Sequence, residues 1–217
     1  MATSAAAQST AERIPPASTA GPECSDGEAG FVAEKMQYRA LAEVGCPILD
    51  PFVLLDEDNA LRLDLCDLLE HIADGLPENA APQLAQLASS AIERGWINHT
   101  VFEEQALFPV LHHHGLGHPE LRACVARLAS EHESDLGFDQ ELIDTLNDLA
   151  RGGPPANPEM VGYLLRAHFV PMRRHVLWEN ALLIPAARRL LSAEEVTTLR
   201  EWIRDREPER CTCGRLG

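Results

Sequence analysis

The sequence predicts an all-α protein: an up-down-up-down four-helix bundle with a short fifth helix at its C-terminal end. Three observations predict it. Four long segments carry apolar residues at helical spacing between Pro and Gly boundaries. The β-branched residues are isolated and never alternate over a useful length, so no strand is expected. The connections between the segments are short, which favours antiparallel neighbouring helices.

The chain ahead of the bundle carries few large apolar side chains. Residues 1–30 are rich in Ala, Ser, Thr, Pro and Gly, and we expect a disordered tail because they bury too little surface to offset the entropy of ordering. We expect residues 31–49 to form an irregular connecting arm and residues 50–206 to form the bundle domain. Residues 207–217 are expected to be a C-terminal tail.

The first two helices have clear boundary residues. Asp50 can cap the first helix, Pro51 suits its first turn, and Gly75 suits its end. Its apolar stripe contains only leucines, at positions 54, 55, 61, 65, 68 and 69. The second helix is expected to begin between residues 79 and 82 and to run to about residue 111, before Gly115.

The remaining helices are bounded in the same way. His118-Pro119 opens the third helix, which is expected to end at Gly152-Gly153. Asn157-Pro158 caps the fourth, which is expected to run to about residue 191. Residues 192–195, Ser-Ala-Glu-Glu, form a capping box that begins the fifth helix, ending near residue 206.

Charge and composition exclude several classes of partner. The formal net charge is −16, and a strongly acidic surface repels nucleic acid and anionic membranes, so we expect neither as a partner. No apolar run approaches the length of a membrane span, and the N-terminal residues lack a secretory signal, so a cytoplasmic location is expected. The six scattered cysteines are then best interpreted as reduced structural thiols, with a metal or redox role for Cys211 and Cys213 left open.

One motif occurs twice, on the second and fourth predicted helices. Each copy has His, then Glu four residues later, Leu eight later and Pro ten later: His99, Glu103, Leu107 and Pro109 in the first, and His175, Glu179, Leu183 and Pro185 in the second. Residues four apart share one face of a helix. A single His–Glu pair is most often an exposed ion pair, but two matched copies indicate one helical hairpin used twice, with both pairs pointing into the bundle. Imidazole and carboxylate groups placed there suit a pair of metal ions.

The repeat also predicts which residues the other two helices contribute. Going back 43 residues from His175 reaches Glu131-His132, and going back 41 from His99 reaches Glu57-Asp58. Asp58 therefore stands where the symmetry of the repeat would place a histidine. We expect Asp58 either to coordinate metal as an oxygen ligand or to form a hydrogen bond at the site.

These motifs resemble the hemerythrin family, and in particular its bacterial HHE cation-binding domains, over roughly residues 50–206. The resemblance implies a hemerythrin-like bundle with two non-haem iron ions. It implies terminal ligands at His99, His132 and His175 and bridging carboxylates at Glu103 and Glu179. The family's first helix contributes a histidine that is absent here. The ferritin-like alternative is disfavoured because no histidine has Glu three residues before it.

The function implied by the resemblance is that of a di-iron protein which binds or reacts with dioxygen, nitric oxide or peroxide in redox or iron stress handling or sensing. Binding is favoured over catalysis, although weak turnover of peroxide or nitric oxide is left open. Two alternatives remain at this point. One is an iron-dependent regulatory module that contacts a protein partner without catalysis, and the other is a degenerate bundle that holds one metal ion.

Overall fold

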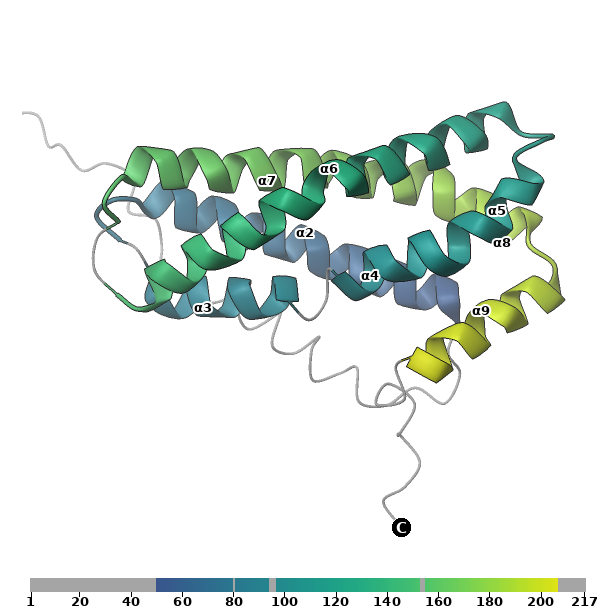
Figure 1. Ribbon diagram of the computed structural model, residues 1–217, viewed down its shortest axis with the longest axis horizontal. Helices are drawn as coiled ribbons and strands as arrows, with labels where there is room; N and C mark the ends of the chain where they lie inside the picture. Colours follow the sequence, from purple (N-terminus) through teal and green to yellow (C-terminus); the bar gives the residue numbers. More distant parts are fainter. Residues whose placement is uncertain (1–49, 80, 94–96, 153–154, 207–217) are drawn as a thin grey trace, which may run out of the picture.

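The computed structural model describes residues 50–79, 81–93, 97–152 and 155–206, drawn in colour in Figure 1. These residues are helical with short turns and contain no strand, as the sequence predicts. None of their helices is long and apolar enough to cross a membrane. The expectations for residues 1–49 and 207–217 lie outside the described ranges.

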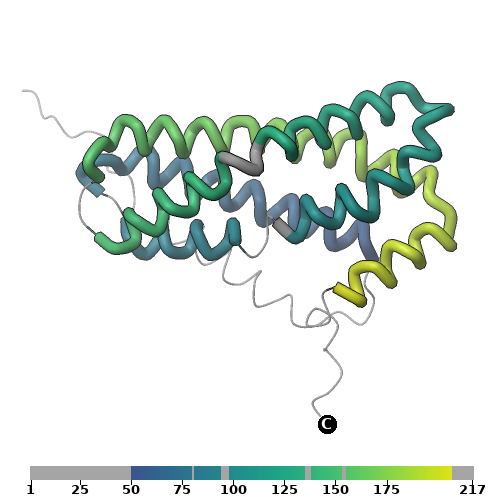
Figure 2. The backbone as a smooth tube through the Cα atoms, viewed as in Figure 1, coloured from purple at the N-terminus to yellow at the C-terminus, as the bar shows by residue number. Residues whose placement is uncertain are grey.

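Four rods form the bundle, and the backbone tube in Figure 2 follows them in alternating directions. The first rod is α2 (Pro51–Gly75) and the third is α6 (Pro119–Ala150). The second consists of α3 (Pro82–Ala91), α4 (Ile97–Phe102) and α5 (Phe108–His114), and the fourth of α7 (Pro158–Trp178) and α8 (Ile184–Leu190). The last helix, α9 (Ala193–Arg206), packs against the end of the bundle near α2.

The helix starts follow the capping expected from the sequence. The Asp50 side chain accepts a hydrogen bond from the backbone N–H of Phe52 at 2.9 Å, which satisfies a donor that lacks a partner within the helix. Asn157 does the same for Met160 at the start of α7, at 3.0 Å. Each of these helices has proline at its first position, where no N–H is needed.

The apolar core is divided into two clusters with a polar layer between them. One cluster centres on Leu69 and Leu146 and the other on Leu107 and Leu183, all with no measurable exposure. Along each rod, a group of buried polar side chains comes between the two clusters. The polar layer consists of Asn59, Arg62, His99, Glu103, His132, His175 and Glu179. The other buried polar residues in the described ranges are Asp64, Ser89 and His168. Apolar packing on both sides therefore shields the polar layer from water.

π-helical turns at both copies of the repeated motif interrupt rods that the sequence predicted as uninterrupted α-helices. They span Glu103–Leu107 and Glu179–Leu183, and each begins at the glutamate of the repeated motif. The backbone N–H of Phe108 donates to the carbonyl of Glu103 five residues back, and Ile184 does the same with Glu179. In both copies a proline follows one residue later. Its ring would collide with the carbonyl four residues back in a regular α-helix, and the wider turn avoids this.

The described cysteines fit the interpretation as reduced thiols. Cys66 and Cys124 are buried and free. Burial raises the pKa of Cys66 to about 12 and that of Cys124 to about 11, so both thiols stay protonated at neutral pH. The other four cysteines lie outside the described residues.

The capping box at α9 gives a testable prediction. Ser192 Oγ accepts from the backbone N–H of Glu195 at 3.3 Å, and the Glu195 carboxylate accepts from the backbone N–H of Ser192 at 2.8 Å. The hydrogen bond from this backbone N–H and the contact with His114 lower the pKa of Glu195 to about 2.

Ser192→Ala is expected to lower the free energy of unfolding by about 1 kcal/mol at pH 7. The Ser192 hydroxyl also donates to the Glu195 carboxylate at 2.9 Å, and because this bond favours the charged carboxylate, part of the loss should disappear as the pH falls from about 4.5 toward 2. Urea unfolding at several pH values measures it, and an unchanged loss at pH 3 would contradict it.

Candidate metal centre

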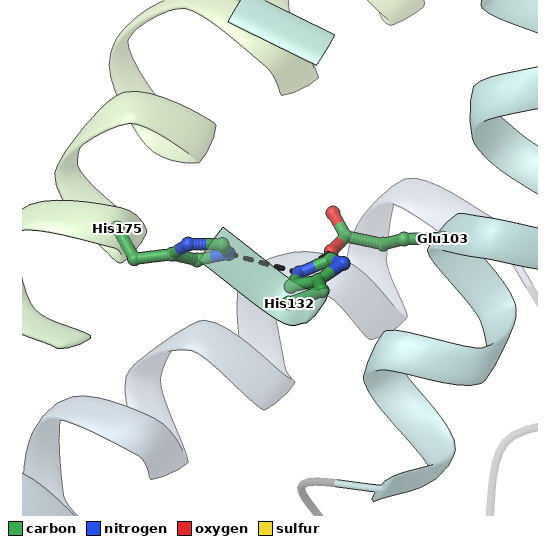
Figure 3. A group of neighbouring side chains, drawn as sticks. All are labelled: Glu103, His132 and His175. Atoms are coloured by element: carbon green, nitrogen blue, oxygen red, sulfur yellow. Dashed lines mark hydrogen bonds and ion pairs between the residues drawn. The ribbon is translucent and has the colours of Figure 1, made fainter. Parts of the chain in front are cut away.

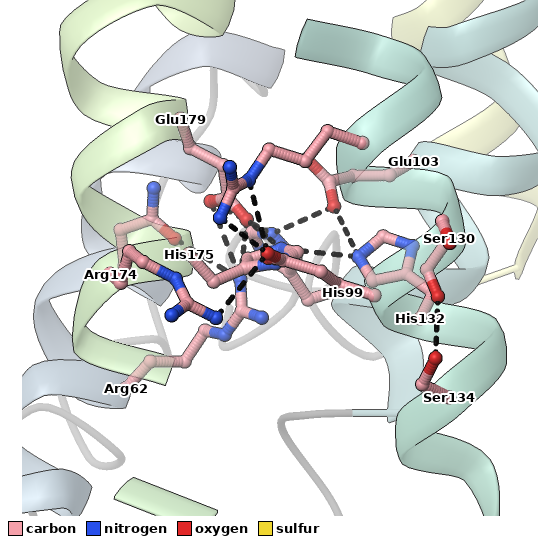
Figure 4. A network of polar contacts seen from close by, with 12 residues as sticks. Arg62, His99, Glu103, Ser130, His132, Ser134, Arg174, His175 and Glu179 are labelled. Atoms are coloured by element: carbon pink, nitrogen blue, oxygen red, sulfur yellow. Dashed lines mark hydrogen bonds and ion pairs between the residues drawn. The ribbon is translucent and has the colours of Figure 1, made fainter. Parts of the chain in front are cut away.

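Three histidine rings point their Nε2 atoms into the polar layer at the middle of the bundle. His99 comes from α4, His132 from α6 and His175 from the last turn of α7. Glu103 and Glu179, the first residues of the two π turns, face the same space and are fully buried. Figure 4 shows these five side chains converging from three rods of the bundle. The structure therefore brings together five of the six residues that the sequence nominates as ligands.

One group of donor atoms, which we call position A, consists of Glu103, His132 and His175 (Figure 3). The Nε2 atoms of His132 and His175 are 3.2 Å apart, and Nε2 of His132 is 3.3 Å from Oε2 of Glu103. Ligand atoms about 2.1 Å from one ion lie roughly 3.0–3.4 Å apart in octahedral or tetrahedral arrangements. Position A therefore has the spacing that a single metal ion requires.

A second group, position B, consists of His99, Glu103 and Glu179. Nε2 of His99 lies 3.6 Å from Oε2 of Glu103 and 3.5 Å from Oε2 of Glu179. The other oxygen of Glu179 lies 2.7 Å from Nε2 of His175 in position A. Both glutamates thus face both positions, which is the geometry expected of carboxylates that bridge two ions.

The outward nitrogen of each ring contacts a carboxylate of its own. Nδ1 of His132 is 2.8 Å from Glu104, Nδ1 of His175 is 2.9 Å from Glu131, and Nδ1 of His99 is 3.4 Å from Asp58. A carboxylate at Nδ1 holds the proton there and leaves Nε2 as a lone-pair donor aimed at the metal. Asp58 lies in neither group of donors. Of its two expected roles, the structure shows the hydrogen bond.

The donor set fits a cation on two further grounds. Within the described residues, both oxygens of Glu103 and Nε2 of His99 are buried without a hydrogen-bond partner, a costly state unless an ion is bound. Burial and Arg62 oppose protonation of His99, yet the surrounding carboxylates prevail and its pKa lies well above the ordinary value. Burial likewise opposes a charge on Glu179, yet Arg62 and His99 hold its pKa well below the ordinary value. The site therefore favours positive charge at its centre.

Arg62 is a residue of this site that the sequence did not lead us to expect. Its side chain is 5% exposed, and its Nη1 donates to Glu179 Oε1 at 3.0 Å and Oε2 at 3.3 Å. A signal for it exists in the sequence. Arg62 lies seven residues after Leu55 and seven before Leu69, so it occupies a core-facing place on α2 where an arginine needs a buried partner.

A family model of the hemerythrin HHE cation-binding domain matches residues 50–187, well over half of the chain. The chain belongs to the hemerythrin family. Comparisons with curated proteins and with solved structures gave no match. The part matched to hemerythrin includes both copies of the repeated motif, His132 and Asp58, and it ends before α9. Membership identifies the chain as a cation-binding hemerythrin domain and agrees with the converging donors of positions A and B.

Proposed function

We propose that this hemerythrin is a non-haem iron protein that takes up two iron ions, at positions A and B, and binds or reacts with dioxygen, nitric oxide or peroxide. We place this activity in redox or iron stress handling or sensing. One observation carries the proposal: three imidazole Nε2 atoms and two buried carboxylates meet in one layer of the bundle, and each ring has a carboxylate at its outer nitrogen.

The residues of the site have different roles. Asp58, Glu104 and Glu131 fix the tautomer and orientation of the three rings. Glu103 belongs to both positions, Glu179 belongs to position B and also lies beside His175, and the two carboxylates would hold two ions as a pair. Iron bound there would supply electrons and an open position for a small ligand. Phe108 stacks on the His132 ring, with centroids 5.7 Å apart, and closes that side of position A with an apolar surface.

A surface groove of about 590 Å³ adjoins the site. It lies between the second rod and α6, and His132 and Glu104 are among its lining residues. Only His132 of the proposed ligands reaches it, and that side chain is 7% exposed. Because so little of the site is exposed at the groove, a diatomic molecule or peroxide suits it better than a larger substrate, which could not reach the buried glutamates. The groove therefore supports a small ligand.

The donor set favours redox chemistry over reversible oxygen carriage. Hard oxygen donors stabilise ferric iron more than imidazole does, and the donor set has two carboxylates and only three histidines, since the first helix contributes no histidine ligand. We therefore favour sensing or stress handling, with weak peroxide or nitric oxide turnover as a secondary activity.

Ferrous loading under anaerobic conditions tests the proposal. The full-length protein, given excess ferrous iron and then desalted and exposed to air, is expected to retain iron and to develop near-ultraviolet charge-transfer absorption. Protein given zinc in the same way is the control and should stay colourless. A folded protein that takes up no iron would overturn the proposal. Turnover of peroxide or nitric oxide by the reduced protein then distinguishes an enzyme from a sensor.

A further inference from the structure

The two halves of the site are not equivalent, although the repeat relates them. In one half, α6 brings Nε2 of His132 to within 3.3 Å of Glu103, beside His175. In the other half, α2 brings Nη1 of Arg62 to 3.3 Å from Oε2 of Glu179, the oxygen beside His99, and to 3.0 Å from Oε1, the oxygen beside His175. Figure 4 shows this guanidinium extending toward the centre. One half has a second nitrogen ligand, and the other half has a permanent cation in its place. A guanidinium carries only hydrogen-bond donors and offers no lone pair to a metal ion.

Hydrogen bonds hold Arg62 in this place. Its Nη1 also donates to Oδ1 of Asn59, one helical turn earlier, at 3.3 Å. The amide of Asn59 in turn donates to Oδ1 of Asn180 at 2.9 Å, which ties α2 to the second π turn. Both Arg62 and Asn59 are buried. Hydrogen bonds therefore fix the guanidinium within the buried polar layer.

Arg62 affects the two positions unequally. Its Nη1 contacts both oxygens of Glu179, which is one of the three donors of position B and is not among the three of position A. The contact with Oε1, the oxygen beside His175, also brings the guanidinium near position A, but Glu103, His132 and His175 complete that position without Glu179. An ion entering position B must share Glu179 with a guanidinium and tolerate its charge at short range, where water cannot screen it. Position A has two histidines and Glu103 as donors, so it depends less on Glu179 than position B does.

We propose that Arg62 is a built-in cation that makes the centre fill in order, with one ion held tightly at position A and a second held weakly at position B. The second ion binds when Arg62 releases Glu179. This inference rests on the proposed function in taking both positions as metal sites. It gives the protein two loaded forms, a one-ion form at low free iron and a two-ion form at high free iron. The concentration of iron then decides which form is present.

Anaerobic titration with Co²⁺, followed by its visible absorption and by equilibrium dialysis, tests the order of filling. The wild-type protein is expected to bind one equivalent tightly and a second about tenfold or more weakly. In Arg62→Met, which keeps the length of the side chain and removes its charge, the second equivalent should bind about tenfold or more tightly than in the wild type. Arg62→Lys keeps the charge and should retain unequal binding. Arg166→Met removes an exposed arginine that pairs with Asp74 and is the matched control.

The possible outcomes separate this inference from the proposed function. Two equal, tight sites in the wild type, or an Arg62→Met protein with unchanged binding, would overturn the role of Arg62 without contradicting the proposed metal centre. No Co²⁺ binding by the folded wild type would overturn the metal centre itself. If Arg62→Met does not fold, Arg62→Gln replaces it, since an amide can still donate to Glu179 without a charge. Strengthened binding of the second equivalent in Arg62→Gln supports the inference, and binding equal to that of the wild type overturns it.

Discussion

His175→Ala is expected to abolish tight metal binding. The ring contributes one of two imidazole nitrogens to position A, 3.2 Å from that of His132, and it contacts the shared Glu179 at 2.7 Å. Its loss leaves position A with one histidine. The affinity should therefore fall by more than the roughly 10–100-fold that removal of an outer hydrogen bond to a ligand costs. Glu131→Gln weakens such an outer hydrogen bond, at Nδ1 of His175, together with the ion pairs of Glu131 with Arg127 and Arg174, and it should give that smaller loss.

Equilibrium dialysis of each variant against Co²⁺ or Fe²⁺, with metal analysis, measures these affinities. His71→Ala is the matched control, because His71 lies on α2 and belongs to neither group of donors. Circular dichroism must show that each variant retains its helices. Metal binding by His175→Ala at the wild-type affinity would show that position A is not the tight site.

Glu179→Leu is expected to destabilise the metal-free protein by about 3–5 kcal/mol, because it takes the buried Arg62 guanidinium away from its carboxylate. The fully buried Glu179 has a pKa well below the ordinary value, so its contribution to stability is present at neutral pH. That contribution is lost as the pH falls below the ordinary carboxyl range. Unfolding by urea in the presence of a chelator measures the difference.

A second substitution separates loss of the charge pair from loss of packing. If the cost comes from stranding the guanidinium, the double variant Arg62→Met, Glu179→Leu should recover most of the stability. Glu70→Leu removes a partner of the half-exposed Arg173 and is the control, expected to cost less than about 1 kcal/mol. A double variant as unstable as Glu179→Leu would assign the loss to packing.

The helices and their starts could be predicted from the sequence because the deciding interactions are local. Asp50, Asn157 and Ser192 cap the helices that they precede through contacts within three residues. The π turns could not be predicted in this way. Pro109 and Pro185 were visible, but whether a proline ends, kinks or widens a helix depends on what the helix packs against. Here both rods continue past the proline because Leu107 and Leu183 are anchored in the core.

The ligand candidates could be predicted because the motif occurs twice. Each copy alone is a weak match, but two matched copies on two helices indicate a site with approximate twofold symmetry. The contacts between rods carry no such signal. Asp58 was placed on the correct face, but only the structure shows it behind the His99 ring, outside both groups of donors. The contact of Arg62 with Glu179 joins residues 117 positions apart, and no local pattern identifies a pair so distant in sequence.

The π turns also determine how the protein tolerates changes in chain length. Each holds one residue more than a regular helical turn needs, at the point where the ligand-bearing part of the rod ends. Removing one residue from Glu103–Leu107 would restore α-helical winding and keep the rod beyond it in its present register, because the wide turn already absorbs the extra residue. Leu111 would then stay in the core, although the proline ring would return to the carbonyl four residues earlier. A one-residue deletion in a regular part of a rod would instead rotate everything beyond it by about 100°, so the two π turns should be the places where the packing of the rods best accepts a deletion.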